Sequence, residues 1–240
     1  MLLSLIIPAY NESKRIRKTL EAYVKKTFPG KKEIIVVLNG CTDNSREVVE
    51  QAIKELGNEI VLYEIKEGSK GKAVRYGFER AQGDIVGFLD ADGATSPEEF
   101  DKLVDQIVKH GVDGAIASRW CKGSKVIGRT SVFRTIASQG FYILTKALFW
   151  MPFRDSQCGA KLFKKEVIKR ILPKLKVENM AFDVEILYLI HSAGFKIREV
   201  PTVWVDQASS EQFASMTKLA RVSLRMFLTI IALRFKHLFK

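Results

Sequence analysis

Two carboxylates follow a short apolar run in the stretch Asp84-Ile85-Val86-Gly87-Phe88-Leu89-Asp90-Ala91-Asp92-Gly93-Ala94. The apolar run predicts a buried strand. Because residues i and i+2 of an extended chain point the same way, Asp90 and Asp92 can present their oxygens to one point in space. Carboxylates held this close repel each other, and a hard divalent ion such as Mg²⁺ or Mn²⁺, completed by phosphate oxygens, relieves that repulsion. The alternative is a solvated turn at a strand end, where Asp and Gly are common.

Predicted strands and helices alternate through the first half of the chain. The expected strands span 2–7, 33–38, 60–65, the run before Asp90 and 113–118, and the expected helices span 12–26, a segment ending near 56, a segment ending near 82 and one starting at 96. This alternation predicts an α/β fold with one Rossmann-like, mostly parallel twisted sheet flanked by helices. Such sheets bind ligands at the carboxyl ends of their strands, where the two aspartates would lie.

Other loops at the same predicted sheet edge carry side chains suited to a ligand. The loop after the first strand offers a flat aromatic ring and a carboxylate, Tyr10 and Glu12. The loop after the third strand places Lys70, Lys72 and Arg75 in a glycine-flanked turn that suits phosphate. The sequence contains neither a P-loop nor a Gly-x-Gly-x-x-Gly fingerprint after the first strand, which disfavours a Rossmann dehydrogenase.

Composition places the chain among globular proteins with an anionic partner. Its 240 residues carry a formal net charge of +12, and 47% of them are hydrophobic. The basic residues are scattered or lie on amphipathic segments without a recognised binding motif, so a nucleic-acid-binding protein is the remote alternative. Cys41, Cys121 and Cys158 are odd in number and lack metal-type spacing, which favours free thiols in a reducing compartment. We expect no signal peptide, because Met1 leads directly into a predicted strand.

Two apolar, basic helices are expected in the second half, over about 129–151 and 213–240. Lys218, Arg221 and Arg225 recur at helical spacing in the second of them. Basic residues interrupt both segments, and neither contains an uncharged stretch near the roughly 20 apolar residues that cross a bilayer. We therefore expect no transmembrane helix. Basic, aromatic-rich amphipathic helices lie in membrane interfaces, which predicts peripheral attachment to the cytoplasmic side of a membrane. The alternative is that both helices only pack on the sheet.

Several longer motifs resemble those of a known family. They are 6–12 (Ile-Ile-Pro-Ala-Tyr-Asn-Glu), 90–95 (Asp-Ala-Asp-Gly-Ala-Thr), Ser118-Arg119, 155–163 (Asp-Ser-Gln-Cys-Gly-Ala-Lys-Leu-Phe) and 182–188 (Phe-Asp-Val-Glu-Ile-Leu-Tyr). With these motifs the chain resembles the inverting family-two glycosyltransferases of the GT-A fold, specifically the polyprenyl-phosphate sugar synthases. The last two motifs are most similar to the glucosyl branch, the dolichyl-phosphate β-glucosyltransferases. The resemblance covers nearly the whole chain and implies a single domain over 1–240, with a nucleotide-sugar half at about 1–120.

The resemblance also implies roles for individual residues. The donor nucleotide sugar would contact Pro8, Tyr10, Glu12, Asn39, Lys70, Lys72, Asp90, Ala91 and Asp92. Asp90 and Asp92 would hold Mg²⁺ or Mn²⁺ against the donor diphosphate. The phosphate of a polyprenyl or dolichyl acceptor would contact Arg119, Arg134, Ser138 and Gln157. The catalytic set would be Asp90, Asp92, Arg119, Asp155, Asp183 and Glu185, and no nucleic-acid partner is implied.

The chain departs from the family pattern in three places. Leu38 and Asn39 stand where two acids are usual, although Asn39 can still hydrogen-bond a base. Ala94 replaces a glutamine that ligates the metal in some relatives, and the loop 206–211 lacks an expected lysine. From the motifs 155–163 and 182–188 we expect glucose transfer from UDP-glucose to dolichyl phosphate. Because of the departures, we keep GDP-mannose as the alternative donor and another lipid or glycan as the alternative acceptor.

Overall fold

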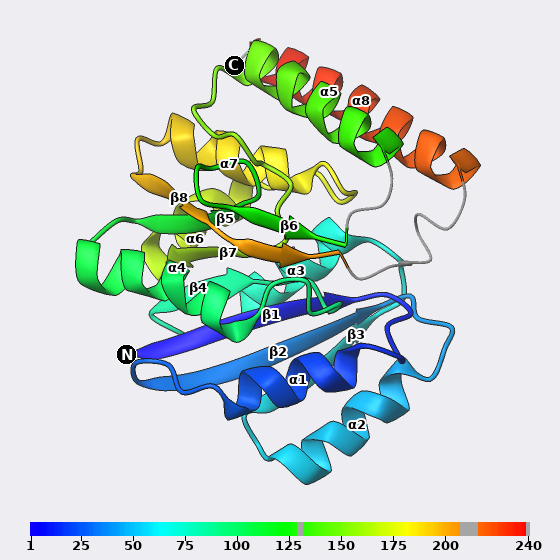
Figure 1. Ribbon diagram of the computed structural model, residues 1–240, viewed down its shortest axis with the longest axis vertical. Coiled ribbons are helices and arrows are strands. Elements are labelled where there is room, and N and C mark those ends of the chain that lie inside the picture. Colours follow the sequence, from blue (N-terminus) through cyan, green and yellow to red (C-terminus); the bar gives the residue numbers. More distant parts are fainter. Residues whose placement is uncertain (129–131, 207–215, 239–240) are drawn as a thin grey trace.

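The computed structural model describes residues 1–128, 132–206 and 216–238, without the side chains of 132–137, 216–219 and 236–238. Its central sheet has seven strands in the order β3-β2-β1-β4-β7-β5-β8 (Figure 1). The strands are β1 (Leu2–Ala9), β2 (Lys31–Asn39), β3 (Ile60–Ile65), β4 (Ile85–Phe88), β5 (Gly114–Ser118), β7 (Lys161–Lys164) and β8 (Ile197–Pro201). All neighbouring pairs are parallel except those of β7, which runs antiparallel to both β4 and β5. The expected α/β fold with a mostly parallel sheet is confirmed.

Helices cover both faces of this sheet. The helices are α1 (Ile16–Lys25), α2 (Ser45–Leu56), α3 (Lys70–Arg80), α4 (Pro97–His110), α5 (Val132–Phe149), α6 (Lys165–Ile171), α7 (Phe182–Ser192) and α8 (Met216–Leu238). One core cluster joins the sheet to α1, α2 and α4, and contains the packed rings of Tyr23, Phe28 and Phe100. The second cluster lies on the other face and joins the sheet to α3, α6 and α7. The chain therefore forms three layers, with the sheet in the middle.

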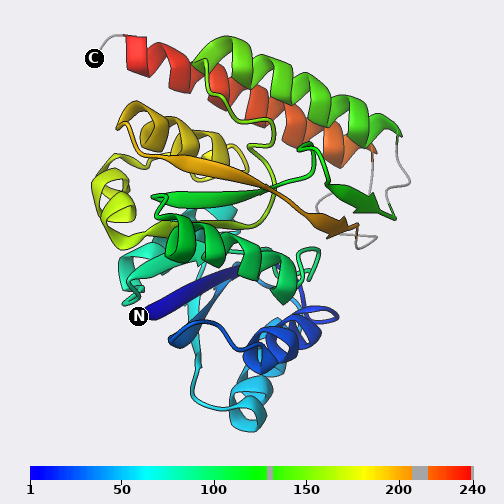
Figure 2. The ribbon, with the colours of Figure 1, turned by 60° about the vertical axis from the view of Figure 1, so that its left-hand side comes forward.

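Helices α5 and α8 form an additional layer outside α7. Figure 2 shows them side by side, and the two helices are in direct contact. Ile230 and Leu233 of α8 are buried in the second core cluster, and the Phe149 ring of α5 lies 5.0 Å from that of Tyr188 in α7. The helices thus occupy the two segments in which apolar helices were expected, and neither is long and apolar enough over its described part to cross a membrane.

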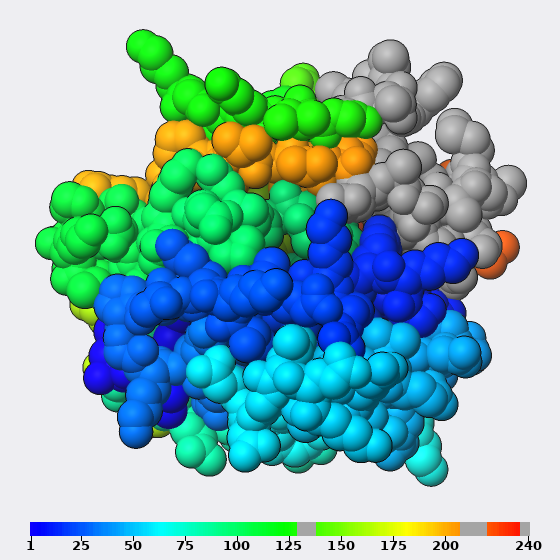
Figure 3. Space-filling model, turned by 60° about the horizontal axis from the view of Figure 1, so that its bottom comes forward, coloured from blue at the N-terminus to red at the C-terminus, as the bar shows by residue number. Residues whose placement is uncertain are grey.

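A second, smaller sheet consists of β6 (Lys125–Ile127) and β9 (Val203–Val205). Trp204 of β9 is buried against the first core cluster and forms an isolated bridge with Thr95, which follows the two aspartates. Figure 3 shows β8 and β9 as an orange band between α4 and the segment that contains β6. This small sheet is therefore attached to the segment that follows the two aspartates.

Two details of the fold differ from the sequence expectation. The first helix begins at Ile16 rather than near residue 12, because Asn11 adopts a left-handed conformation and the chain then turns with Arg15 N bonded to the Glu12 carbonyl. The short antiparallel strand β7 was not expected. It begins with Lys161 beside Phe88, so the segment before it passes close to the end of β4.

Replacing Phe100 by Ala should lower the free energy of unfolding by about 3–5 kcal/mol, because this fully buried ring packs edge-on against Tyr23 and Phe28. Replacing Trp150, whose surface is 81% exposed, should change it by no more than about 0.5 kcal/mol. Urea titration followed by circular dichroism measures both. Equal losses in the two variants would contradict the core assigned here.

Candidate active site

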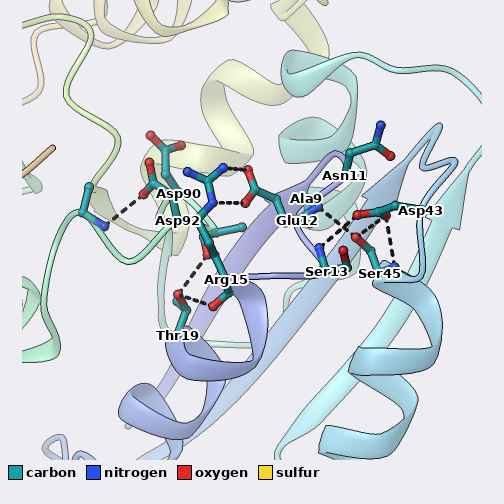
Figure 4. A network of polar contacts seen from close by, with 12 residues as sticks. Ala9, Asn11, Glu12, Ser13, Arg15, Thr19, Asp43, Ser45, Asp90 and Asp92 are labelled. Carbon is teal, nitrogen blue, oxygen red and sulfur yellow. Dashed lines mark hydrogen bonds and ion pairs between the residues drawn. The ribbon is translucent and has the colours of Figure 1, made fainter. Parts of the chain in front are cut away.

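Asp90 and Asp92 lie just beyond the carboxyl end of β4, as the sequence predicts. The N-terminal turn of α3 and the loop after β1 approach the same edge of the sheet, and Figure 4 shows Glu12 and Arg15 beside the two aspartates. Parallel strands present their carboxyl ends at one edge, so the loops after β1, β3 and β4 meet there. The structure thus brings together residues that are far apart in the sequence.

Asp90 is paired with Lys70, the first residue of α3. The Lys70 Nζ lies 2.5 Å from Asp90 Oδ1, and the lysine side chain is only 14% exposed. Burial alone would lower the pKa of Lys70, but the carboxylates of Asp90, Asp183 and Asp92 outweigh it and raise that pKa above its usual value. A Cβ placed on Gly159 would collide with the Asp90 carboxylate, so the segment before β7 packs directly on it. The Asp90 side chain is therefore held from two sides.

Asp92 accepts a hydrogen bond from the Ala94 N–H at 2.9 Å and makes no ion pair with any described residue. Burial and the neighbouring charge of Asp90 raise the pKa of Asp92. No group of three acidic, histidine or cysteine side chains in the described chain could hold a metal by itself. Two carboxylates that repel each other still suit a hard divalent ion whose remaining ligands are phosphate oxygens and water. The donor set therefore fits Mg²⁺ or Mn²⁺.

Glu12 and Arg15 form a bidentate ion pair beside the aspartates (Figure 4). The Glu12 oxygens accept from Arg15 Nε and Nη2 at 2.7 and 2.6 Å, whereas the buried Nη1 has no hydrogen-bond partner in the described chain. Burial raises the pKa of Glu12 to about 7, Arg15 acts in the opposite direction, and Asp92 and Asp90 add to the rise. This carboxyl group therefore titrates near neutral pH.

The remaining expected donor residues occupy several environments. Pro8 and Ala91 are buried, and the Ala91 carbonyl accepts a hydrogen bond from Thr19. The Asn39 side chain is buried as well and donates to the Ala9 carbonyl at 2.8 Å, which ties the ends of β1 and β2 together. The Tyr10 ring lies against Gly68, in the loop that leads to α3. Lys72 turns toward Glu67, 2.8 Å away, rather than toward Asp90.

Arg119 and Asp155 form a buried pair next to this region. Arg119 Nε and Nη2 donate to the two oxygens of Asp155 at 2.7 and 2.8 Å, and the Arg119 guanidinium lies 5.3 Å from the ring centre of Trp204. Burial alone would raise the pKa of Asp155, but Arg119 lowers it below its usual value. The Glu199 carboxylate accepts from the backbone N–H groups of Arg154 and Asp155.

The other three residues expected at the acceptor are Gln157, Ser138 and Arg134. The buried Gln157 Nε2 finds no hydrogen-bond partner among the described residues. Buried donors are rarely left without a partner, so this nitrogen is suited to a ligand. Ser138 is a half-buried residue of α5. The side chain of Arg134 and the loop 207–211 lie outside the described residues.

Asp183 and Glu185 both lie in the first turn of α7, but they face different partners. Asp183 forms a buried ion pair with Lys161 at 2.5 Å, and Lys161 also donates to the Cys158 carbonyl. Burial raises the pKa of Asp183, against the effect of Lys161 and Lys70. Glu185 accepts from the backbone N–H groups of Lys176 and Val177, at 2.9 and 2.7 Å.

Three residues that the sequence did not identify hold expected site residues in place: Arg15 binds Glu12, Lys161 binds Asp183, and Glu199 binds the Asp155 N–H. No local signal marks Lys161, because the four-residue strand that it begins has lysines at both ends and no clear periodicity. Arg15 could have been found as the basic residue one turn after Glu12. Nothing local marks Glu199, which meets Asp155 only through the pairing of β5 with β8.

The raised pKa of Glu12 predicts a pH-dependent stability. Between about pH 5 and about pH 7 the folded protein retains a proton on Glu12 that the unfolded chain has released, so the folded state loses stability as pH rises through this window. Glu12→Gln cannot titrate there. The unfolding free energy of wild type minus that of Glu12→Gln should therefore fall across this window, as measured by urea titration at several pH values. A difference that rises with pH or stays constant would contradict this.

Comparison with known proteins identifies the family of this chain. The family model for glycosyl transferase family 2 matches residues 4–172. A dolichyl-phosphate beta-glucosyltransferase of Dictyostelium discoideum is 34% identical, and the alignment covers 98% of this chain and 75% of that protein. One of Drosophila melanogaster is 36% identical, and the alignment covers 91% of this chain and 72% of that protein.

A solved structure shares the fold. Glucosyl-3-phosphoglycerate synthase from Mycobacterium tuberculosis, in complex with Mn²⁺, UDP and glucosyl-3-phosphoglycerate, superposes with a TM-score of 0.72 at 16% identity. The alignment covers 97% of this chain and 79% of that one, which confirms the expected GT-A fold. The expected family is confirmed as well: the chain belongs to glycosyl transferase family 2 and is a glycosyltransferase.

Proposed function

We propose that this glycosyltransferase moves glucose from UDP-glucose to dolichyl phosphate and inverts the anomeric centre to give a β-linked lipid-phosphate sugar. The observation that carries the proposal is the pair of same-edge carboxylates, Asp90 and Asp92, with Lys70 beside them. Relatives that share 32–36% identity over most of the chain are named for dolichyl-phosphate glucosyl transfer, which supports the acceptor and the sugar. The neighbour solved with Mn²⁺ and UDP supports the nucleotide and the metal.

In this proposal Asp90 and Asp92 hold Mg²⁺ or Mn²⁺, which neutralises the charge that develops on the departing diphosphate. The chain supplies further positive charge there through Lys70, which stays protonated because its carboxylate partners raise its pKa. We propose that the Tyr10 ring, which lies against Gly68, and Glu12, which is paired with Arg15, line the nucleoside side of the site. Asn39 and Ala91 keep the strand ends in place through their backbone partners.

The acceptor needs no general base from the protein, because a phosphate monoester with a second pKa of about 6 is mostly dianionic near neutral pH. Arg119 and Gln157 are proposed to bind this phosphate together with Arg134 and Ser138. The paired Asp155 fixes the Arg119 fork in one orientation, and the Nε2 of Gln157, which has no partner among the described residues, can donate to a ligand oxygen. We assign Asp183, held by Lys161, to the sugar, and Glu185 to the loop that it supports.

The exposed side of the α5 and α8 pair is proposed to rest on the membrane that contains the lipid acceptor, on its cytoplasmic side. Large apolar side chains are exposed here, namely Ile143, Trp150, Leu224, Phe227, Leu228 and Phe235. Arg221 and Arg225 are exposed on the same helix as the last four. Apolar side chains with neighbouring basic residues are the combination that binds an anionic bilayer surface.

Purified protein with dolichyl phosphate should form lipid-linked glucose from UDP-glucose in the presence of Mg²⁺ or Mn²⁺, and should form little lipid-linked mannose from GDP-mannose. Asp92→Asn should lower this activity by at least about 100-fold, because the site loses one metal-binding charge. Asp105→Asn, which changes an aspartate in a surface ion pair of α4, is the matched control and should keep full activity. Transfer of radiolabelled sugar into the organic phase measures both.

Two outcomes would overturn the assignment. Mannose transfer that exceeds glucose transfer would show that UDP-glucose is not the donor. Full turnover in excess chelator would show that the reaction needs no metal ion. Thermal unfolding of each variant separates a lost site from a lost fold, since Asp92→Asn relieves repulsion and should not lower the melting temperature.

Membrane binding should depend on salt. The triple variant Lys218→Glu, Arg221→Glu, Arg225→Glu should detach from anionic vesicles, because each basic residue near such a surface contributes about 1 kcal/mol and salt screens this attraction. Wild type should float with vesicles at low salt and less at high salt. The control Lys25→Glu, Lys54→Glu changes exposed charges on α1 and α2, at the opposite end of the molecule (Figure 1), and should float like wild type. Wild type that never floats, or a triple variant that floats equally well, would show that the helices only complete the core.

A further inference from the structure

A loop of residues 175–181, here called the strap, crosses the N-terminus of α3 on its way to α7. The backbone carbonyl of Glu178 in the strap accepts two hydrogen bonds from α3, from Ser69 Oγ at 2.5 Å and from the Gly71 N–H at 2.7 Å. Further along α3, Arg75 Nη1 donates to the Leu175 carbonyl at 3.1 Å. The strap is therefore bonded to α3 through Leu175, its first residue, and through Glu178 in its middle.

These bonds fix the backbone on either side of Lys70. Ser69 and Gly71 are its two neighbours, and both donate to the same carbonyl oxygen. There is no room for a side chain at Gly71, where a Cβ would lie 2.6 Å from that oxygen. The Lys70 ammonium lies 2.5 Å from Asp90 and 5.8 Å from the ring centre of Phe182, which directly follows the strap. The strap therefore holds the segment from which the Lys70 side chain extends, and Phe182, which follows the strap, contacts its ammonium.

The strap is in turn attached to α8 through Asn179. The Asn179 Oδ1 accepts from the Ala181 N–H at 2.9 Å, which shapes the turn, and its Nδ2 donates to Thr229 Oγ1 at 2.8 Å. The Thr229 hydroxyl donates to the Arg225 carbonyl of its own helix, so its oxygen is oriented to accept from the strap. The adjacent Ile230 is fully buried, which holds this face of α8 against the protein.

We propose that Asn179 and Thr229 are positioning residues for the donor site, which act through Lys70. A continuous series of contacts runs from Thr229 through Asn179 and the Glu178 carbonyl to the backbone around Lys70, and ends at Asp90. The inference rests on the proposed function for one point, that Lys70 contacts the donor diphosphate. It adds that α8, the helix proposed to lie on the membrane, also sets the geometry of the nucleotide-sugar site.

The test compares UDP binding, measured by calorimetry with Mn²⁺, in wild type, Thr229→Val and Asn179→Ala, each with and without Lys70→Met. Thr229→Val keeps the shape of the side chain and removes the hydroxyl. Each single change should weaken UDP binding about three- to tenfold, the effect of one neutral hydrogen bond. In the Lys70→Met background neither should have any further effect, because the group that they position is gone. Thr145→Val, which removes a buried hydroxyl that bonds only within α5, should bind UDP like wild type.

Hydrogen exchange without ligand provides a second measurement. The peptide that contains 69–73 should exchange faster in Thr229→Val and Asn179→Ala than in wild type and Thr145→Val, and this result does not depend on the nucleotide. Unchanged exchange, unchanged UDP binding, or equal losses with and without Lys70 would each overturn the inference. Wild type that binds no UDP would instead contradict the proposed donor, while the exchange experiment would still decide whether the strap depends on Thr229. If Asn179→Ala does not fold, the isosteric Thr229→Val carries the test.

Discussion

Repulsion between carboxylates at one edge of the sheet governs how this site is built. Four acidic side chains of the site each form an ion pair with a basic side chain. The pairs are Glu12 with Arg15, Asp90 with Lys70, Asp155 with Arg119 and Asp183 with Lys161. A buried carboxylate is costly unless it is paired, so each base makes its acid tolerable at that place. Among the residues that the structure describes, Asp92 has no such base, and burial and the neighbouring charge of Asp90 raise its pKa. A divalent ion shared with Asp90 would supply the missing positive charge.

The antiparallel strand β7 makes this arrangement possible. It lies between β4 and β5 and starts at Lys161, so the segment before it turns back across the end of β4. Gly159 there touches the Asp90 carboxylate, and Asp155 reaches Arg119 at the end of β5. On the other side, the strap joins α3 to α8 and holds Lys70. The donor side, the acceptor side and the outer helix pair are thus connected through a few short segments.

The sequence predicted what depends on local pattern. Alternating apolar segments gave the parallel strands and flanking helices, and the spacing of Asp90 and Asp92 gave their common location after β4. It did not predict β7, because a four-residue strand with lysines at both ends carries no clear periodicity. It could not predict that Lys72, which it assigned to the donor site, pairs with the exposed Glu67, because a flexible lysine can reach any acid that the fold leaves nearby. The partners of Asp155 and Asp183 depend on strand pairing over long sequence separations, which no local pattern encodes.

The most direct test is whether Asp92, which has no basic partner among the described residues, is needed to bind a divalent metal ion. Electron paramagnetic resonance can count bound Mn²⁺ as it is titrated into the protein with UDP present. The account predicts one tightly bound ion per chain in wild type and in Asp105→Asn, and loss of that ion in Asp92→Asn, because a single carboxylate already paired with Lys70 is a poor ligand set. Asp92→Asn that binds Mn²⁺ as tightly as wild type would contradict it.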